Sequence, residues 1–166
     1  MERNQNQTKF VRMLILSAVG LMPFFLIASA IAESNTKVET MTYPELNRLI
    51  TEGDCNCMMV FMAAWCGPCK EELPDLNRLH KRYGKRGLRL IGISVDSGGP
   101  AAIQAVLREK KVIFPVYWVG ETAVDALKIF GVPMIFMIKS GQIVEKIPGK
   151  CSYEFLEAKI LDFLKP

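Results

Sequence analysis

The sequence lacks several features that would identify common classes of protein. It has one histidine, His80, among 166 residues, and we find no internal repeat, no low-complexity segment and no basic tract with interleaved aromatic residues. The chain beyond residue 32 holds 18 of the 21 basic and 16 of the 17 acidic residues, for a net charge of +2. This bias is too weak to indicate nucleic-acid binding, and a lone histidine is most simply a polar surface residue.

The charge-free stretch is confined to the N-terminus. Residues 13–32, MLILSAVGLMPFFLIASAIA, follow a segment with three basic side chains and close on the small-x-small triplet AIA. Two interpretations remain open: a signal peptide cut after Ala32, or an uncleaved anchor long enough to span a bilayer. Either one exports the rest of the chain. We therefore expect a leader or anchor at 1–32, a linker at 33–42 and one domain at 43–166, since this length supports only one good core.

Hydrophobic periodicity in the domain alternates between strand and helix. Apolar runs predict strands, and amphipathic segments between them predict helices. The expected strands are 58–64, 88–95, 114–119, 134–138 and 143–147, and the expected helices are 43–52, 66–83, 101–110, 123–130 and one after Ser152. This order predicts an α/β fold with a parallel sheet, helices on both faces and one antiparallel strand from the last hairpin.

Five cysteines in an exported domain are candidates for disulfides. Cys66 and Cys69 are separated by Gly67 and Pro68, and Cys55 and Cys57 stand upstream of the strand at 58–64. A four-cysteine zinc site is the alternative, but that strand would hold the two pairs about 20–25 Å apart. We therefore expect no metal. Cys55 and Cys57 are most simply buried or free thiols, with a strained vicinal-type pair as the alternative. Cys151 is most simply a small hydrophobic residue at the start of a helix, and a position near a partner-binding surface is the alternative.

The position of Cys66 indicates chemistry. A strand that ends just before it places the sulfur at the carboxyl edge of the sheet and at the start of a helix. Free N–H groups and the helix dipole there stabilise a thiolate, the attacking species in disulfide exchange. Gly67 allows a partner backbone to approach, and Pro68 suits the first helical turn. Cys69, three residues on and expected to be less exposed, is suited to resolve a mixed disulfide.

WCGPCK at 65–70 resembles the active-site hexapeptide of thioredoxin. FGVP at 130–133 resembles the loop of that family in which a cis-proline packs against the cysteine pair, so the resemblance implies a cis bond between Val132 and Pro133. A trans proline that only begins a strand is the alternative. The segments RLIGISVD, FPVYWV and GVPMIFMIKSGQIVEKIPG, together with Pro74 inside the helix, resemble the TlpA/ResA-like branch over about residues 43–166.

One residue departs from the thioredoxin pattern. The buried aspartate expected six residues before the first cysteine is replaced by Val60, which cannot transfer a proton. The branch resemblance implies that Glu72, three residues after Cys69, lies near the cysteines and takes its place. Partial burial would raise its pKa and allow it to accept the Cys69 proton. The alternative is an exposed first-turn acid favoured by the helix dipole, as we expect for Glu71.

By this resemblance the chain is an exported thiol-disulfide oxidoreductase that needs no cofactor beyond its own disulfide. Trp65 would contact partner proteins, and the Gly-Pro spacer is typical of reducing members of the family. A reductant in an oxidising compartment implies a transmembrane electron donor of the DsbD/CcdA kind and clients such as the haem-site cysteines of apocytochrome c. Two alternatives remain. A thiol peroxidase usually has Thr or Pro where this chain has Ala63, and a non-catalytic or metal-delivery module would not reduce disulfides.

Overall fold

The computed structural model describes residues 36–52 and 55–165, so the expected leader or anchor at 1–32 lies outside it. In chain order the elements are β1 (Glu39–Thr40), α2 (Tyr43–Thr51), β2 (Cys57–Met62), α3 (Gly67–Tyr83), η1 (Gly84–Arg86), β3 (Arg89–Ser94), α4 (Pro100–Glu109), β4 (Val116–Trp118), α5 (Thr122–Leu127), β5 (Met134–Lys139), β6 (Gln142–Pro148) and α6 (Tyr153–Phe163). Every helix and strand expected from periodicity is present, with ends shifted by a few residues.

The strands form one six-stranded sheet in the order β1-β4-β3-β2-β5-β6. β2 pairs in parallel with β3, β3 with β4, and β4 with β1. β5 is antiparallel to both of its neighbours, and so it is the one strand that runs opposite to the rest. The expected mixed α/β sheet is confirmed, and the antiparallel strand lies next to β2 rather than at the edge.

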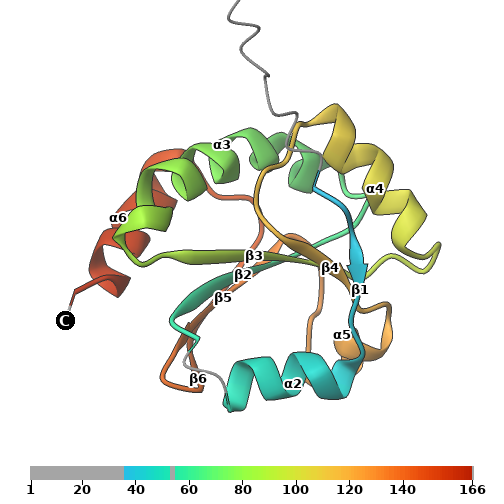
Figure 1. Cartoon of the computed structure of the whole chain (residues 1–166), viewed down its shortest axis with the longest axis horizontal. Coiled ribbons are helices and arrows are strands. Elements are labelled where there is room, and N and C mark those ends of the chain that lie inside the picture. The colour runs from blue at the N-terminus through green and yellow to red at the C-terminus, as the bar shows by residue number, and fades with distance from the viewer. Residues whose placement is uncertain (1–35, 53–54, 166) are drawn as a thin grey trace, which may run out of the picture. The chain divides into compact units, whose positions relative to one another are not determined.

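Helices cover both faces of the sheet (Figure 1). α3, α4 and α6 lie on one face, and α2 and α5 lie on the other. The central strand β2 is therefore buried along its whole length, which explains why its residues are all apolar or cysteine. Phe61 of β2 and Phe136 of β5 pack against each other with tilted rings, whose centroids lie 4.7 Å apart.

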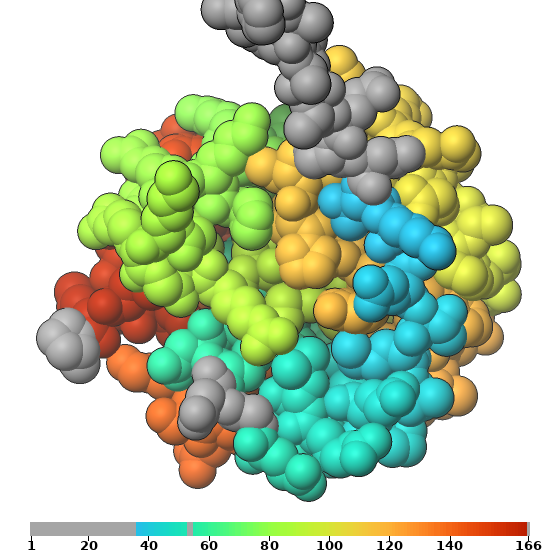
Figure 2. Space-filling view, in the orientation of Figure 1, coloured from blue at the N-terminus to red at the C-terminus, as the bar shows by residue number. Residues whose placement is uncertain are grey.

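The segment expected to be a linker contains a strand. β1 pairs Glu39 with Tyr117 and Thr40 with Trp118, and the Val38 amide donates to the Gln104 side chain at 2.8 Å. Figure 2 shows the blue surface around β1 between the yellow surface of α4 and the turquoise surface of α2. Residues 39–40 of the expected linker therefore form an edge strand, which the sequence did not indicate because both side chains are polar and exposed.

Within residues 36–52 and 55–165, no helix is both long and apolar enough to cross a bilayer. The described domain is held by its own core, which includes Leu73, Leu76, Leu79 and Tyr83 on α3 and Leu156 and Ile160 on α6.

Two glycines with positive φ provide a test of this packing. Gly141, in the β5–β6 hairpin, has φ +75°, and a Cβ there would lie 2.6 Å from the Thr51 carbonyl oxygen of α2. Gly87 has φ +99°, and its nearest contact would be an ordinary 3.9 Å to Leu164.

We expect Gly87→Ala to lower the free energy of unfolding by about 1–2 kcal/mol, the cost of the left-handed conformation. Gly141→Ala should cost about 1–3 kcal/mol more, because backbone must also move to relieve the overlap. Urea unfolding of both variants measures the difference. Equal losses would show that the hairpin does not pack against the end of α2 as described.

Candidate active site

The site is centred on a disulfide at the start of α3. Cys66 is the N-cap residue of this helix, and its sulfur is bonded to that of Cys69 at 2.07 Å. The Cys69 amide donates to Cys66 Sγ at 3.1 Å, and Pro68 lies in the first turn, where its missing N–H costs nothing. The predicted placement of Cys66 at the mouth of the helix is confirmed, and the amide contact would stabilise negative charge on its sulfur.

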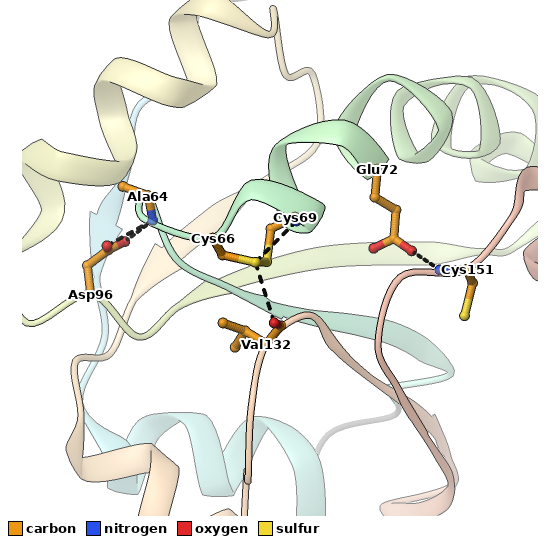
Figure 3. The surroundings of a disulfide bond; sticks show 7 residues. All are labelled: Ala64, Cys66, Cys69, Glu72, Asp96, Val132 and Cys151. Carbon is orange, nitrogen blue, oxygen red and sulfur yellow. Dashed lines mark hydrogen bonds between the residues drawn. A yellow bond between two sulfur atoms is a disulfide. The ribbon is translucent and has the colours of Figure 1, made fainter.

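Exposure does not distinguish the two cysteines as the sequence suggested. Cys66 is 4% exposed and Cys69 is 3% exposed, so in the disulfide form both are buried. What separates them is their place on the helix. Cys66 is the N-cap residue, and its Sγ lies 3.4 Å from the Val132 carbonyl oxygen, whereas Cys69 lies inside the helix (Figure 3).

The loop of Val132 and Pro133 lies beside the disulfide, and the peptide bond between these two residues is cis, as predicted. The Gly149 amide donates to the Pro133 carbonyl at 2.8 Å, so the end of β6 supports this loop from behind. The two motifs that resemble thioredoxin, 65–70 and 130–133, therefore meet in space although they are more than sixty residues apart.

A cavity of about 420 Å³ opens next to the disulfide. It is bordered by two exposed aromatic side chains, Trp65 (67% exposed) and Phe130 (92% exposed), and by two acidic ones, Glu121 and Asp125. The sequence identified Trp65 but placed Phe130 inside a helix; α5 ends at Leu127, and Phe130 projects into solvent instead. Exposed aromatic side chains beside a cavity are suited to bind another polypeptide.

Asp96 is a residue of this site that sequence reasoning missed. It is 2% exposed, and its carboxylate accepts the Ala64 amide at 2.8 and 3.0 Å and the Ser94 hydroxyl at 2.8 Å. Ala64 lies two residues before Cys66, so this carboxylate fixes the backbone that delivers the cysteine from β2 to α3 (Figure 3). The only signal in the sequence was a single acid directly after a buried strand, which also describes an ordinary loop.

Glu72 is buried, as the branch resemblance implied, and not an exposed first-turn acid. It is 1% exposed, and Oε1 accepts the Cys151 amide at 2.9 Å. Oε2 has no hydrogen-bond partner among the described residues. Burial raises the pKa of Glu72, while the Cys151 amide and the charge of Lys150 act in the opposite direction. Glu72 follows Cys69 by one helical turn, and none of the hydrogen bonds found in the described part of the chain joins it to either sulfur.

Glu71, by contrast, is exposed, as expected. Its carboxylate pairs with Lys150 Nζ at 2.6 Å, and this contact lowers the pKa of Glu71. The two adjacent acids on α3 therefore have pKa values displaced in opposite directions: burial raises that of Glu72, and Lys150 lowers that of Glu71.

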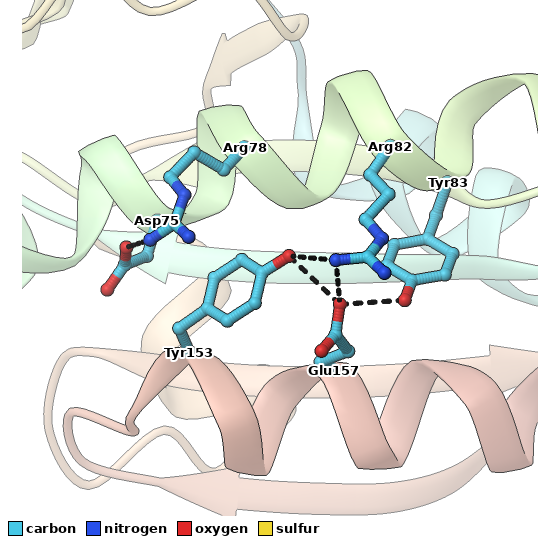
Figure 4. Close-up of polar contacts among 6 residues, drawn as sticks. All are labelled: Asp75, Arg78, Arg82, Tyr83, Tyr153 and Glu157. Carbon is cyan, nitrogen blue, oxygen red and sulfur yellow. Dashed lines mark hydrogen bonds and ion pairs between the residues drawn. The ribbon is translucent and has the colours of Figure 1, made fainter.

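The orientation of α3 is fixed by a polar cluster with α6 (Figure 4). Glu157 Oε1 accepts the Tyr83 hydroxyl at 2.8 Å and the Tyr153 hydroxyl at 2.9 Å, and pairs with Arg82 at 3.0 Å. The guanidinium of Arg78 stacks over the Tyr153 ring at 4.1 Å. These contacts hold the far end of the helix whose first turn contains the disulfide.

The other cysteines form no metal site with this pair. Cys55 and Cys57 make a second disulfide with both residues fully buried, and they stand at the opposite end of β2 from Cys66. Neither is the free thiol that the sequence left open. Among the residues that the structure describes, no three His, Cys, Asp or Glu side chains lie together as metal ligands would. Cys151 has a free thiol, half-buried, and burial raises its pKa.

A family model and several known proteins are similar to this chain. The model of the AhpC/TSA family matches residues 30–147. A thiol-disulfide oxidoreductase ResA of Oceanobacillus iheyensis is 32% identical over 107 residues, which are 63% of this chain and 55% of that protein. The match thus spans about half the length of such relatives, although the ResA of Geobacillus kaustophilus aligns at 26% identity over 94% of this chain and 93% of its own length.

A solved structure shows the same fold. The thiol:disulfide interchange protein of the thioredoxin family from Chlorobium tepidum superposes with a TM-score of 0.59 at 26% identity, covering 66% of this chain and 79% of that one. The thioredoxin-like fold expected from the sequence is therefore confirmed for the described domain.

The opposite pKa displacements of Glu72 and Glu71 give a testable pH dependence. Because the folded protein binds the Glu72 proton more tightly than the unfolded chain does, wild-type stability should fall as pH rises from the ordinary value of 4.5 through the raised pKa. Glu72→Gln removes this decline, so the variant should gain stability relative to wild type over that range in urea unfolding. Gln can still accept the Cys151 amide.

Glu71→Gln is the matched control. The lowered pKa of Glu71 adds stability above 4.5 that is lost as pH falls, so this variant should lose stability relative to wild type as pH rises. A Glu72→Gln difference that does not change with pH would contradict the burial described for Glu72.

Proposed function

Because this chain belongs to the AhpC/TSA family, we propose that it is a thiol-disulfide oxidoreductase whose working couple is Cys66 and Cys69. One observation supports this above the others: the two sulfurs are bonded at a helix N-terminus, with the Cys69 amide 3.1 Å from Cys66 Sγ. That environment lowers the pKa of a thiol, and a thiolate is the attacking species in disulfide exchange.

The proposed reaction moves two electrons from the dithiol to a client protein. The Cys66 thiolate attacks one sulfur of a client disulfide, which forms a Cys66–client mixed disulfide and releases the first client thiolate. Cys69 then attacks Cys66 Sγ, which releases the second client thiolate and closes the Cys66–Cys69 disulfide. Glu72 would accept the proton that Cys69 must lose for this second step.

The client segment would lie against the Val132–Pro133 loop and the neighbouring cavity. Gly67 leaves room for a backbone, since nothing would lie within 4 Å of a Cβ at that position. Trp65 and Phe130 would contact apolar side chains beside the client cysteine.

We favour a reductant that acts outside the cytoplasm. The Gly-Pro spacer is that of thioredoxin, whose potential is about −270 mV against about −120 mV for a strong oxidant of the DsbA type. The hydrophobic segment 13–32 would direct export, either as a retained anchor or as a cleaved leader. A donor of the DsbD/CcdA kind would restore the dithiol, and cysteines of apocytochrome c are one candidate class of client.

Insulin reduction in the presence of dithiothreitol tests the proposal. The wild-type protein should accelerate precipitation of the insulin B chain, and Cys66→Ser should return the rate to that of dithiothreitol alone, because the attacking sulfur is gone. Cys69→Ser should retain the attack but accumulate a mixed disulfide, detectable by mass spectrometry. A wild-type rate equal to that of Cys66→Ser would indicate a non-catalytic binding module. Rapid peroxide consumption without insulin reduction would indicate a thiol peroxidase.

The role of Glu72 has a separate test. Glu72→Gln should change the pH profile of insulin reduction by removing the limb that reports its raised pKa, because no carboxylate remains to accept the Cys69 proton. Glu71→Gln, one residue away and exposed, should leave the profile unchanged. An unaltered profile in Glu72→Gln would end the assignment.

A further inference from the structure

A second cavity lies at the opposite end of the sheet from the disulfide. Its volume is about 600 Å³, and it is bordered by the C-terminal part of α3, the start of β3 and the segment before β4. Arg89 begins β3 and Pro115 directly precedes β4, whereas Cys66 follows the end of β2. Figure 2 shows the surfaces near residues 80–90 and 112–118 side by side, in yellow-green and orange.

This cavity, here called the basic groove, has cationic walls and an apolar floor. Lys81, Lys85 and Arg89 border it, and all three are exposed. None of its lining residues is acidic, and no ion pair found within residues 36–52 and 55–165 involves these three side chains. The floor is formed by Leu88, Leu90 and Ile113. Such a surface attracts an anion that has an apolar part.

The described chain begins beside the basic groove. The Thr36 hydroxyl donates to the Val112 carbonyl at 2.8 Å, and the Gln104 amide donates to the Thr36 carbonyl at 3.0 Å. Val112 is the direct neighbour of Ile113 in the groove. Thr36 therefore lies at the same end of the sheet as the three cationic side chains.

Chain length links this end of the domain to a membrane. The uncharged segment 13–32 ends four residues before Thr36, and four residues span at most about 14 Å. A retained anchor would therefore keep Thr36 close to the headgroup layer, which is roughly 5–8 Å thick on each side of the hydrocarbon core. The groove next to Thr36 would face the same layer.

We propose that the basic groove docks on anionic lipid headgroups of the membrane that holds the N-terminal segment. Lys81, Lys85 and Arg89 would contact the headgroup phosphates, and the apolar floor would receive the upper part of an acyl chain. Docking in this orientation directs the Cys66–Cys69 end of the sheet away from the bilayer. The inference rests on the anchor interpretation of the proposed function, but it involves none of the redox residues.

Amine footprinting of the full chain reconstituted into vesicles tests the proposal. The rates at which Lys81 and Lys85 are acylated are compared, by mass spectrometry, between phosphatidylcholine vesicles and vesicles that also contain phosphatidylglycerol. A basic residue near an anionic surface strengthens binding about fivefold, so we expect acylation at least about fivefold slower on the anionic vesicles. High salt should restore the rate. Lys128, an exposed residue at the end of α5, is the internal reference, and its acylation rate should not differ between the two kinds of vesicle.

Two variants make the same change in charge, one in the basic groove and one outside it. Arg89→Glu should weaken the protection of Lys85, whereas Arg48→Glu, on the exposed surface of α2, should leave it intact. Both should reduce insulin at the wild-type rate. Protection with no insulin reduction by wild type would overturn the proposed function and support the docking surface.

Two outcomes would overturn the docking surface. Equal acylation on both kinds of vesicle would exclude recognition of anionic lipid, because any protection would then come from proximity alone. Protection by inorganic phosphate without vesicles, at the level seen with phosphatidylglycerol, would assign the groove to a small soluble anion.

Discussion

The geometry at the start of α3 depends on the buried carboxylate of Asp96. It accepts both the Ala64 amide, just past the end of β2, and the Ser94 hydroxyl at the end of β3. A charged group with 2% exposure is stable only when its oxygens are hydrogen-bonded, and here those bonds join the two adjacent strand ends. The turn from strand to helix is thereby fixed, and with it the position of Cys66 at the mouth of α3. The Trp118 indole donates to the Asp96 carbonyl at 2.7 Å, which extends the same support to β4.

A second constraint comes from the C-terminal hairpin. Its end, residues 149–151, supports the Pro133 carbonyl through Gly149, pairs with Glu71 through Lys150 and donates to Glu72 through Cys151. One short loop therefore sets the surroundings of the cis-proline and of both acids on α3. Glu72 differs from Glu71 because its carboxylate is buried, whereas that of Glu71 is exposed.

Local signals in the sequence predicted much of this arrangement. An apolar run that stops at a cysteine predicted the strand–helix junction, and two motifs predicted that Cys66 and Pro133 would meet. The missed features depend on contacts between distant residues. β1 has only two residues and no apolar alternation, so its pairing with β4 could not be seen. Asp96 accepts a hydrogen bond from an amide 32 residues away, which no local pattern indicates. Phe130 is exposed because α5 ends three residues before it. The pairing of Cys55 with Cys57 likewise required coordinates, since spacing alone left a disulfide, free thiols and a zinc site open.

The contact between Glu72 and Cys151 joins residues 79 positions apart in the chain. During translation, Cys66 and Cys69 leave the ribosome well before the segment that covers Glu72 and supports the cis-proline loop. The nascent chain therefore displays both thiols in an unfinished setting, in which Glu72 is still hydrated and retains an ordinary acidity. On the proposed function, the pair would reach its final reactivity only when the last hairpin has been synthesised and docked, so the order of synthesis would delay the appearance of the nucleophile.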